Sequence, residues 1–116
     1  MTRGQIEAQI SEAVIRFEKE YMGRGPIETK TVILDDLVIV RLKGVLTPAE
    51  EKLAQTADGA LLIKKVRMQL LENGKAMLEV MIGDITRMKV ISLHTDISTK
   101  TGERIIVFVL NQKFEC

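Results

Sequence analysis

The sequence contains little that could support a disulfide, base stacking or a membrane span. Cys116 is the only cysteine among the 116 residues, so no intramolecular disulfide can form and a secreted disulfide-rich fold is excluded. Tryptophan is absent and aromatic residues make up 3% of the chain, which argues against stacking on nucleic-acid bases. The longest apolar run, residues 105–110, is far shorter than the roughly 20 residues of a membrane helix.

The chain also lacks an excess of positive or negative charge. Seventeen basic and sixteen acidic residues leave a formal net charge of +1, which gives no general attraction to nucleic acid or anionic lipid. The first residues enter an amphipathic pattern without the apolar segment of a signal peptide. We therefore expect a cytoplasmic protein with no nucleic-acid partner and no direct membrane insertion, so that any membrane role would act through a partner.

The composition itself is that of one globular domain covering residues 1–116. The chain is 46% hydrophobic and 28% charged, and a domain of this size can bury a core without a disulfide or a structural metal. Neither a cofactor nor a metal is indicated by any ligand pattern, because the chain has a single histidine and its cysteine is terminal.

Hydrophobic spacing in the first third of the chain predicts a helix followed by a β-hairpin. The helix is indicated by apolar residues at steps of three and four, namely Ile6, Ile10, Val14, Phe17 and Tyr21. Its stop signal is Gly23-Arg24-Gly25-Pro26. Segments 28–34 and 37–43 are rich in β-branched residues and flank a two-residue turn, Asp35-Asp36.

The middle of the chain predicts a long helix. Thr47 and Glu50 form a capping box with Pro48 at the first helical position. Beyond it, apolar residues recur at steps of three and four and form a stripe made of Ile63, Val66, Leu70, Met77, Met81, Ile85 and Met88. The position expected between Leu70 and Met77 is occupied by Gly74. We expect one helix over residues 59–88, and the alternative is two shorter helices interrupted at Gly59 or Gly74.

Two strands close the chain. Segments 90–95 and 103–110 read as a second hairpin joined by residues 96–102, and residues 105–110 are apolar at every position, which is typical of a central strand covered on both faces. The order is α-β-β-α-β-β. The sequence thus predicts a two-layer α+β fold, in which the N-terminal helix and the long central helix pack on one face of a four-stranded, mainly antiparallel sheet.

The length of the central helix predicts a homodimer. A helix over residues 59–88 spans about 45 Å, whereas a seven-residue strand spans about 23 Å. The overhanging part would expose a further apolar set, Leu62, Leu71, Leu78 and Ile82, which a second copy could cover. A kink at Gly74 that folds the helix back is the alternative.

Few residues suggest chemistry. His94 and Asp96 leave the same face of a strand and could act as a base with its orienting carboxylate, although a lone histidine near a strand end is more often a solvated or hydrogen-bonded structural residue. The hydroxyls and Lys100 of residues 98–102 could hold an anion, or form a polar hairpin tip. Arg24 lies between two glycines whose N–H groups could bind an anion, or which end the first helix. Cys116 is expected to be a free thiol.

Long segments resemble the small bacterial MpsC-like family, whose label is Na+-translocating membrane potential-generating system and which was earlier known as a domain of unknown function. The segments that carry the resemblance are residues 4–7, 23–26, 33–50 and 94–104. The resemblance implies a cytoplasmic accessory component that works beside membrane proteins of ion-translocating or inorganic-carbon uptake systems. It implies no catalytic residue.

Two hypotheses of function follow from these patterns. In the first, the protein is a non-enzymatic interaction domain that docks on a membrane-associated partner through an exposed apolar helix surface or the hairpin of residues 95–104. In the alternative, it is a small-anion sensor or weak enzyme. The ligand would then be bicarbonate or a phosphate-bearing metabolite, held by His94, Asp96, Lys100, Arg104 and Arg24.

Overall fold

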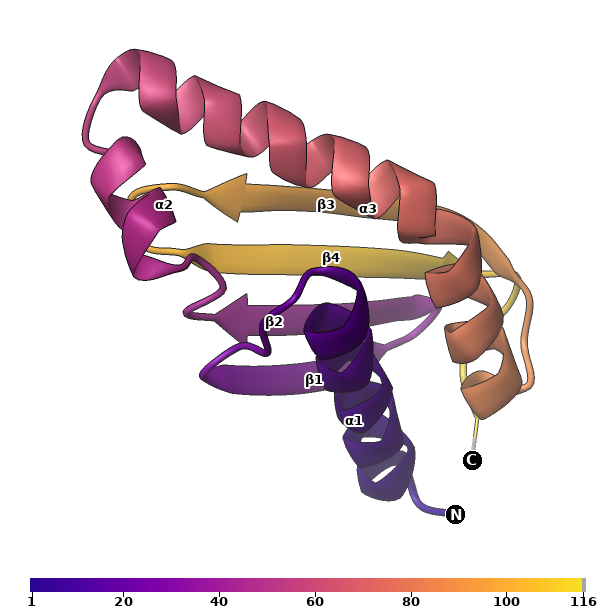
Figure 1. The fold of residues 1–116 in the computed structure, drawn as a ribbon. Helices are drawn as coiled ribbons and strands as arrows, with labels where there is room; N and C mark the ends of the chain where they lie inside the picture. Colours follow the sequence, from indigo (N-terminus) through magenta and orange to yellow (C-terminus); the bar gives the residue numbers. More distant parts are fainter. Residues whose placement is uncertain (116) are drawn as a thin grey trace.

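The computed structural model describes residues 1–115 and shows an open antiparallel sheet with its helices on one side (Figure 1). The strands lie in the order β1-β2-β4-β3, so the two hairpins meet through β2 and β4. The predicted α+β fold is confirmed. Its elements are α1 (Arg3–Tyr21), β1 (Glu28–Leu34), β2 (Leu37–Lys43), α2 (Pro48–Leu53), α3 (Ala57–Thr86), β3 (Val90–Ser98) and β4 (Glu103–Leu110).

The local signals place most element ends correctly. The predicted strands 28–34, 37–43 and 103–110 have the limits of β1, β2 and β4, whereas β3 continues to Ser98 instead of ending at residue 95. Asp35 adopts a positive φ of 55° in the turn between β1 and β2, which an aspartate tolerates better than most residues. The free thiol expected at Cys116 lies outside the described residues.

The predicted capping box starts α2, a helix of only six residues. Thr47 Oγ1 accepts the Glu50 N–H at 3.2 Å, and Glu50 Oε1 accepts the Thr47 N–H at 2.9 Å. Thr56 then caps α3 by accepting the Gly59 N–H at 3.0 Å. Gly59 therefore does not interrupt a helix. It is needed where α2 passes α3, because a Cβ there would collide with the carbonyl oxygen of Leu53.

The long helix α3 is continuous over 30 residues, which confirms the prediction of one helix with its limits shifted by two residues. Figure 1 shows its second half turning toward α1. At the contact, a Cβ on Gly74 would lie 2.7 Å from Cζ of Phe17 and 3.1 Å from Cε2 of Tyr21. The absence of a side chain at Gly74 thus lets the two helices approach closely.

The apolar stripe predicted for α3 is only partly buried, because Ile63 belongs to the core and Met81, Ile85 and Met88 pack against it, whereas the middle of the stripe is exposed. Val66 is 47% exposed and Met77 is 52% exposed. The helix instead buries a stripe at four-residue spacing that contains Ile63, Arg67, Leu71, Gly74, Leu78 and Ile82. This stripe contains a charged residue and a glycine, so the spacing of apolar residues in the sequence did not single it out as a core stripe. It is buried because Arg67 pairs with the partly buried Glu50 and Gly74 allows the close contact with α1.

This correction removes the basis of the dimer argument from helix overhang. Leu71, Leu78 and Ile82 were expected to need a second copy to cover them, but they are at most 1% exposed within one chain. Of that set, Leu62 remains on the surface, at 51% exposed. Whether the protein is a homodimer must therefore be argued from other surfaces.

Within residues 1–115, helices cover one face of the sheet. Along β4, Ile106, Phe108 and Leu110 are buried beneath the helices, whereas the alternate residues Ile105 and Val107 are partly exposed. The position of β4 as a central strand is confirmed, but the expected cover on both of its faces is wrong. An apolar run along a strand indicates that both faces are apolar, and it does not show that the same chain covers them both.

We expect the substitution Gly74→Ala to lower the free energy of unfolding by about 1 kcal/mol, measured by urea denaturation. The added methyl group must displace the Phe17 ring, and overpacking of this kind costs about 1–3 kcal/mol, which exceeds the gain of about 1 kcal/mol from replacing a helical glycine. Gly4→Ala is the matched control in α1, where the nearest atom to the new Cβ is 3.9 Å away. A Gly74→Ala protein as stable as the control would contradict the close helix contact.

Candidate functional site

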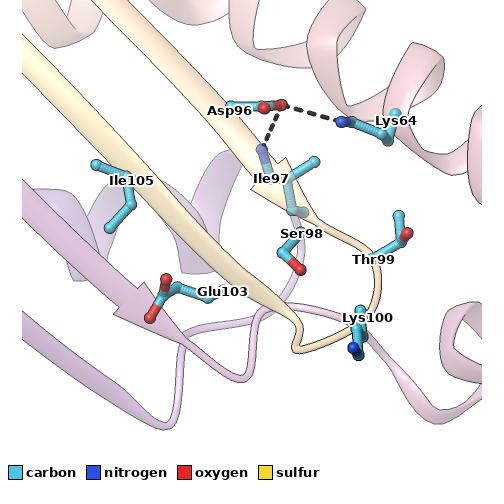
Figure 2. Close-up of a pocket in the computed structure, with 8 residues that line it drawn as sticks. All are labelled: Lys64, Asp96, Ile97, Ser98, Thr99, Lys100, Glu103 and Ile105. Atoms are coloured by element: carbon cyan, nitrogen blue, oxygen red, sulfur yellow. Dashed lines mark hydrogen bonds and ion pairs between the residues drawn. The ribbon is translucent and has the colours of Figure 1, made fainter.

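His94 and Asp96 lie on the outer face of the edge strand β3, where their strand partners are Val107 and Ile105. Nε2 of His94 is 3.1 Å from Oγ of Ser92. One carboxylate oxygen of Asp96 accepts the Ile97 N–H at 2.8 Å and lies 3.3 Å from Nζ of Lys64 (Figure 2). The backbone N–H of Ile97 is the main contribution that lowers the pKa of Asp96. His94 is therefore next to a hydroxyl, and the charged partner of Asp96 is Lys64 from α3.

An open hollow of about 420 Å³ lies beside the β3–β4 hairpin. Asp96, Lys100, Lys64 and Glu103 supply its charged lining, which consists of two ammonium groups and two carboxylates. In Figure 2 the Lys100 side chain points away from Asp96. Lys100 and Asp96 are thus brought to one hollow, as the anion hypothesis expects, but its lining has no excess of positive charge.

Lys100 also borders a second hollow of about 330 Å³ on the other side of the hairpin tip, together with Leu46 and Gly102. Arg24 does not line this hollow but contacts one residue of its lining, because its Nη1 donates a hydrogen bond to the Leu46 carbonyl oxygen at 3.1 Å. Arg24 is therefore adjacent to Lys100's second hollow and not to the hollow that Asp96 lines.

Arg104 lies on the opposite face of the sheet from His94 and Asp96. It is 1% exposed, and its Nη1 donates to Oγ1 of Thr95 at 2.9 Å. Its Nε and Nη2 atoms are buried without a hydrogen-bond partner among residues 1–115. The five residues singled out from the sequence are thus distributed over both faces of the sheet and two sides of the hairpin.

A buried group of charges between the sheet and the helices was missed by the sequence analysis. Glu18, Arg67 and Arg104 come from α1, α3 and β4 and are each at most 5% exposed. Burial raises the pKa of Glu18, and the nearby guanidinium groups of Arg104 and Arg67 partly oppose this rise. Burial likewise lowers the pKa of Arg104. The available signal was helical spacing, because Glu18 follows the core residue Val14 by four positions and so lies on the buried face of α1.

Arg67 is the best-paired member of this group. Its guanidinium donates to Glu50 through Nε at 3.0 Å and through Nη2 at 2.6 Å, and Nη2 also donates to the Val45 carbonyl oxygen at 2.9 Å. The paired arginine lowers the pKa of Glu50 against the opposing effect of partial burial. Glu50 thus has two tasks, because it closes the capping box of α2 and holds α3 through Arg67.

The buried group has the features of a structural cluster. The cavity that reaches Arg104 and Thr95 measures about 20 Å³, which is room for about one water molecule. Buried charges of opposite sign partly compensate one another's desolvation. Within the cluster, Arg67 and Glu50 join α3 to α2, whereas both carboxylate oxygens of Glu18 are buried without a hydrogen-bond partner among residues 1–115.

These features define a small α+β domain whose buried charges lie among core residues and most of whose exposed large apolar residues lie on α3 and on the sheet. No helix within residues 1–115 has the length and apolarity needed to cross a membrane. The sequence model of the family described as Na+-translocating membrane potential-generating system (MpsC) matches residues 2–112, and the chain belongs to this family. The resemblance noted from the sequence is thereby confirmed.

Two proteins of Bacillus subtilis (strain 168) are similar to this chain over most of its length. Uncharacterized protein YbcI is 46% identical over 114 residues, which cover 98% of this chain and 92% of the relative. Uncharacterized protein YrhF is 25% identical over 109 residues, which cover 92% of this chain and 88% of the relative. No solved structure matches the chain. The relatives thus support the family without adding a biochemical activity.

We expect Arg67→Met to lower the free energy of unfolding by about 3 kcal/mol, because it leaves the Glu50 carboxylate without its buried partner while keeping the stem of the side chain. Arg41→Met is the matched control. The ion pair of Arg41 with Glu103 has side chains 52% and 27% exposed, so its loss should change stability by less than about 1 kcal/mol. Equal effects of the two substitutions in chemical denaturation would show that the Arg67–Glu50 pair does not hold α3.

Proposed function

We propose that the protein is a cytoplasmic, non-enzymatic accessory component of a Na+-translocating, membrane-potential-generating system, and that it acts by binding a membrane protein of that system. The family description supports the setting. The observation that carries the proposed mode of action is an uncharged apolar surface along α3. In this proposal, the partner moves the ions and the present chain binds to it and regulates or assembles it.

The exposed α3 stripe consists of Leu62, Val66, Leu70, Met77 and Val80. Each of these side chains is 36–62% exposed, and at about 100° per residue they lie within about 80° of the helix circumference. The other residues on this side are Gln69 and Asn73, which are polar but uncharged. A partner can therefore cover five turns of helix without desolvating any charge, as in complexes that join an apolar helix face to a groove.

The stripe borders the core without belonging to it. It lies beside the buried residues Ile63, Leu71 and Leu78 on the same helix, so its position is fixed by the packing that holds α3 on the sheet. A rigid apolar surface of this kind suits protein binding, because little side-chain or backbone freedom is lost on contact.

We expect the double substitution Leu62→Glu and Val66→Glu to abolish copurification of the membrane partner. The experiment uses a tagged protein expressed in its native cells, gentle solubilisation of the membranes and quantification of each copurified protein. Both positions are exposed, so the fold should persist, which circular dichroism can verify. The same strain should lose the Na+-dependent part of its membrane potential, measured with a potential-sensitive dye, because the system would lack its accessory component.

The matched control for this experiment is His94→Ala with Lys100→Ala, which changes two polar surface residues away from the stripe. It should retain the stoichiometric membrane partner. A partner that remains bound to the doubly substituted stripe variant, or that is lost equally in the control, would contradict docking through the stripe. Only a membrane protein recovered at a fixed ratio counts as the partner, since single apolar contacts also capture unrelated proteins.

A second candidate function is the binding of a small anion beside the β3–β4 hairpin. The observation that favours it is the placement of Lys64 and Lys100 in one hollow of about 420 Å³. Bicarbonate and phosphate are small enough for this volume and would be bound by the two ammonium groups. Asp96 and Glu103 line the same hollow and oppose an anion, so the first proposal is the better supported one.

Calorimetric titration decides the second candidate. If the hollow binds an anion, bicarbonate or inorganic phosphate should bind the wild-type protein, and Lys100→Ala should weaken that affinity at least about tenfold, as expected for one charge-assisted contact. Lys113→Ala removes a lysine that does not line the hollow and serves as the control. Equal affinities of the two variants would exclude the hairpin hollow as the anion site.

A further inference from the structure

We propose that a second copy of this chain covers the outer sheet face, and that the two sheets pack against each other around a two-fold axis parallel to their strands. This inference is independent of the membrane-system role, because it rests only on the residues of the sheet. It also differs from a dimer built on overhanging helix, which the burial of Leu71, Leu78 and Ile82 within one chain no longer supports.

The outer sheet face is ordered in rows by the strand register. Directly paired residues in antiparallel strands point to the same side of a sheet. The central row is Val32, Ile39, Val107 and His94, taken across β1, β2, β4 and β3. The next row toward the β1–β2 turn is Leu34, Leu37, Val109 and Ser92. Six of the eight residues in these two rows are aliphatic.

The face is large enough for a stable contact between sheets. Four strands of seven residues measure about 19 by 23 Å, so a pair of such faces has a projected area of about 900 Å². The accessible area is larger, because side chains make each face uneven. Specific interfaces bury upward of about 1,000 Å² in total. Val32 and Leu34 are 41% and 56% exposed in the single chain, which is unusual for aliphatic residues side by side in a sheet.

The third row supplies the charge pattern that selects a second copy and its orientation. It consists of Lys30, Arg41, Ile105 and Asp96, again in the order β1, β2, β4 and β3. One edge of this row is cationic and the other is anionic. Asp96 already contacts Lys64 of its own chain but keeps a side chain that is 76% exposed, so it can accept a further cation.

A two-fold axis parallel to the strands makes this row self-complementary. The rotation keeps each row at its own height and reverses the order of the strands, so that β1 of one copy lies over β3 of the other. Lys30 then faces Asp96 of the second copy, twice by symmetry. In the apolar rows, Ile39 faces Val107 and Leu37 faces Val109. Aligned sheets of this kind pack about 10 Å apart with a relative rotation of about 30°.

The other two-fold arrangement fits less well. An axis across the strands through the central row keeps the order of the strands and exchanges the outer rows. Lys30 would then face the aliphatic Leu34 of the second copy without an opposite charge, whereas Arg41 keeps its ion pair with Glu103 of its own chain in either arrangement. The charge pattern therefore favours the axis along the strands.

The dimer with its axis along the strands leaves the helices accessible to other proteins. Because α1 and α3 cover the inner face of the sheet, a dimer formed through the outer faces places both helical layers on its outside (Figure 1). The exposed α3 stripe of each chain stays available for another protein. Ser92 and His94, hydrogen-bonded to each other at 3.1 Å, would form a polar rim along the β3 edge.

The first test is the mass of the full-length protein in solution, measured by light scattering after size exclusion at several concentrations. We expect twice the chain mass of 13.0 kDa. Ile39→Asp, at the centre of the outer face, should shift the mass to that of one chain, whereas the matched control Val66→Asp on α3 should leave the dimer intact. Circular dichroism of both variants shows that the fold is retained.

The second test reverses charges at the proposed interface, so it does not require the substitution of an apolar residue. Lys30→Glu and Asp96→Lys should each weaken dimerisation about tenfold, since each reversal acts on two symmetric contacts, and the double variant should recover most of the affinity. Lys30 and Asp96 lie on opposite edge strands of one chain, about 14 Å apart, so a contact within one chain cannot produce this recovery.

Three results would overturn the proposal. The first is a wild-type protein that has the mass of one chain at all concentrations. The second is a dimer that survives Ile39→Asp but dissociates with Val66→Asp, which would place the interface on α3. The third is a double variant, Lys30→Glu with Asp96→Lys, that dimerises no more tightly than either single variant. Lys30 of one copy would then not contact Asp96 of the other.

Discussion

The ion pair between Arg67 and Glu50 sets the rotation of α3, and the remaining surfaces follow from that rotation. Arg67 donates to both carboxylate oxygens of Glu50 and to the carbonyl oxygen of Val45, so α3 cannot turn without leaving a buried charge unpaired. With Arg67 facing inward, Leu71 and Leu78 enter the core. Val66 and Met77, one step around the helix, remain on the surface.

The second constraint is that one chain supplies helices for a single face of its sheet. The inner face receives α1 and α3, with Gly74 allowing the two helices to touch. The outer face carries aliphatic residues in two rows and charges of opposite sign at the two ends of a third. The molecule therefore has two apolar surfaces of different origin. One belongs to a helix and is the surface that we propose binds a partner protein, and the other belongs to the sheet and is the surface that we propose binds a second copy.

Local signals were sufficient to predict the elements and the fold class. The capping box at Thr47, the turn at Asp35 and the β-branched segments around it depend on residues that are neighbours in sequence, so their meaning changes little with context. The candidate site was harder to predict. Arg104 was grouped with His94 and Asp96 by sequence proximity, but strand alternation and the pairing of β3 with β4 place it on the opposite face.

The sequence by itself determined an α+β domain of two hairpins and two long helices, and membership of the MpsC family. Only the tertiary structure decided which apolar residues are buried. Ile63 and Val66 are equally suited to a core, and the difference between them arises from the pairing of Arg67 with Glu50 and the contact of Gly74 with Phe17. Both contacts join residues far apart in the chain, and no local pattern specifies them.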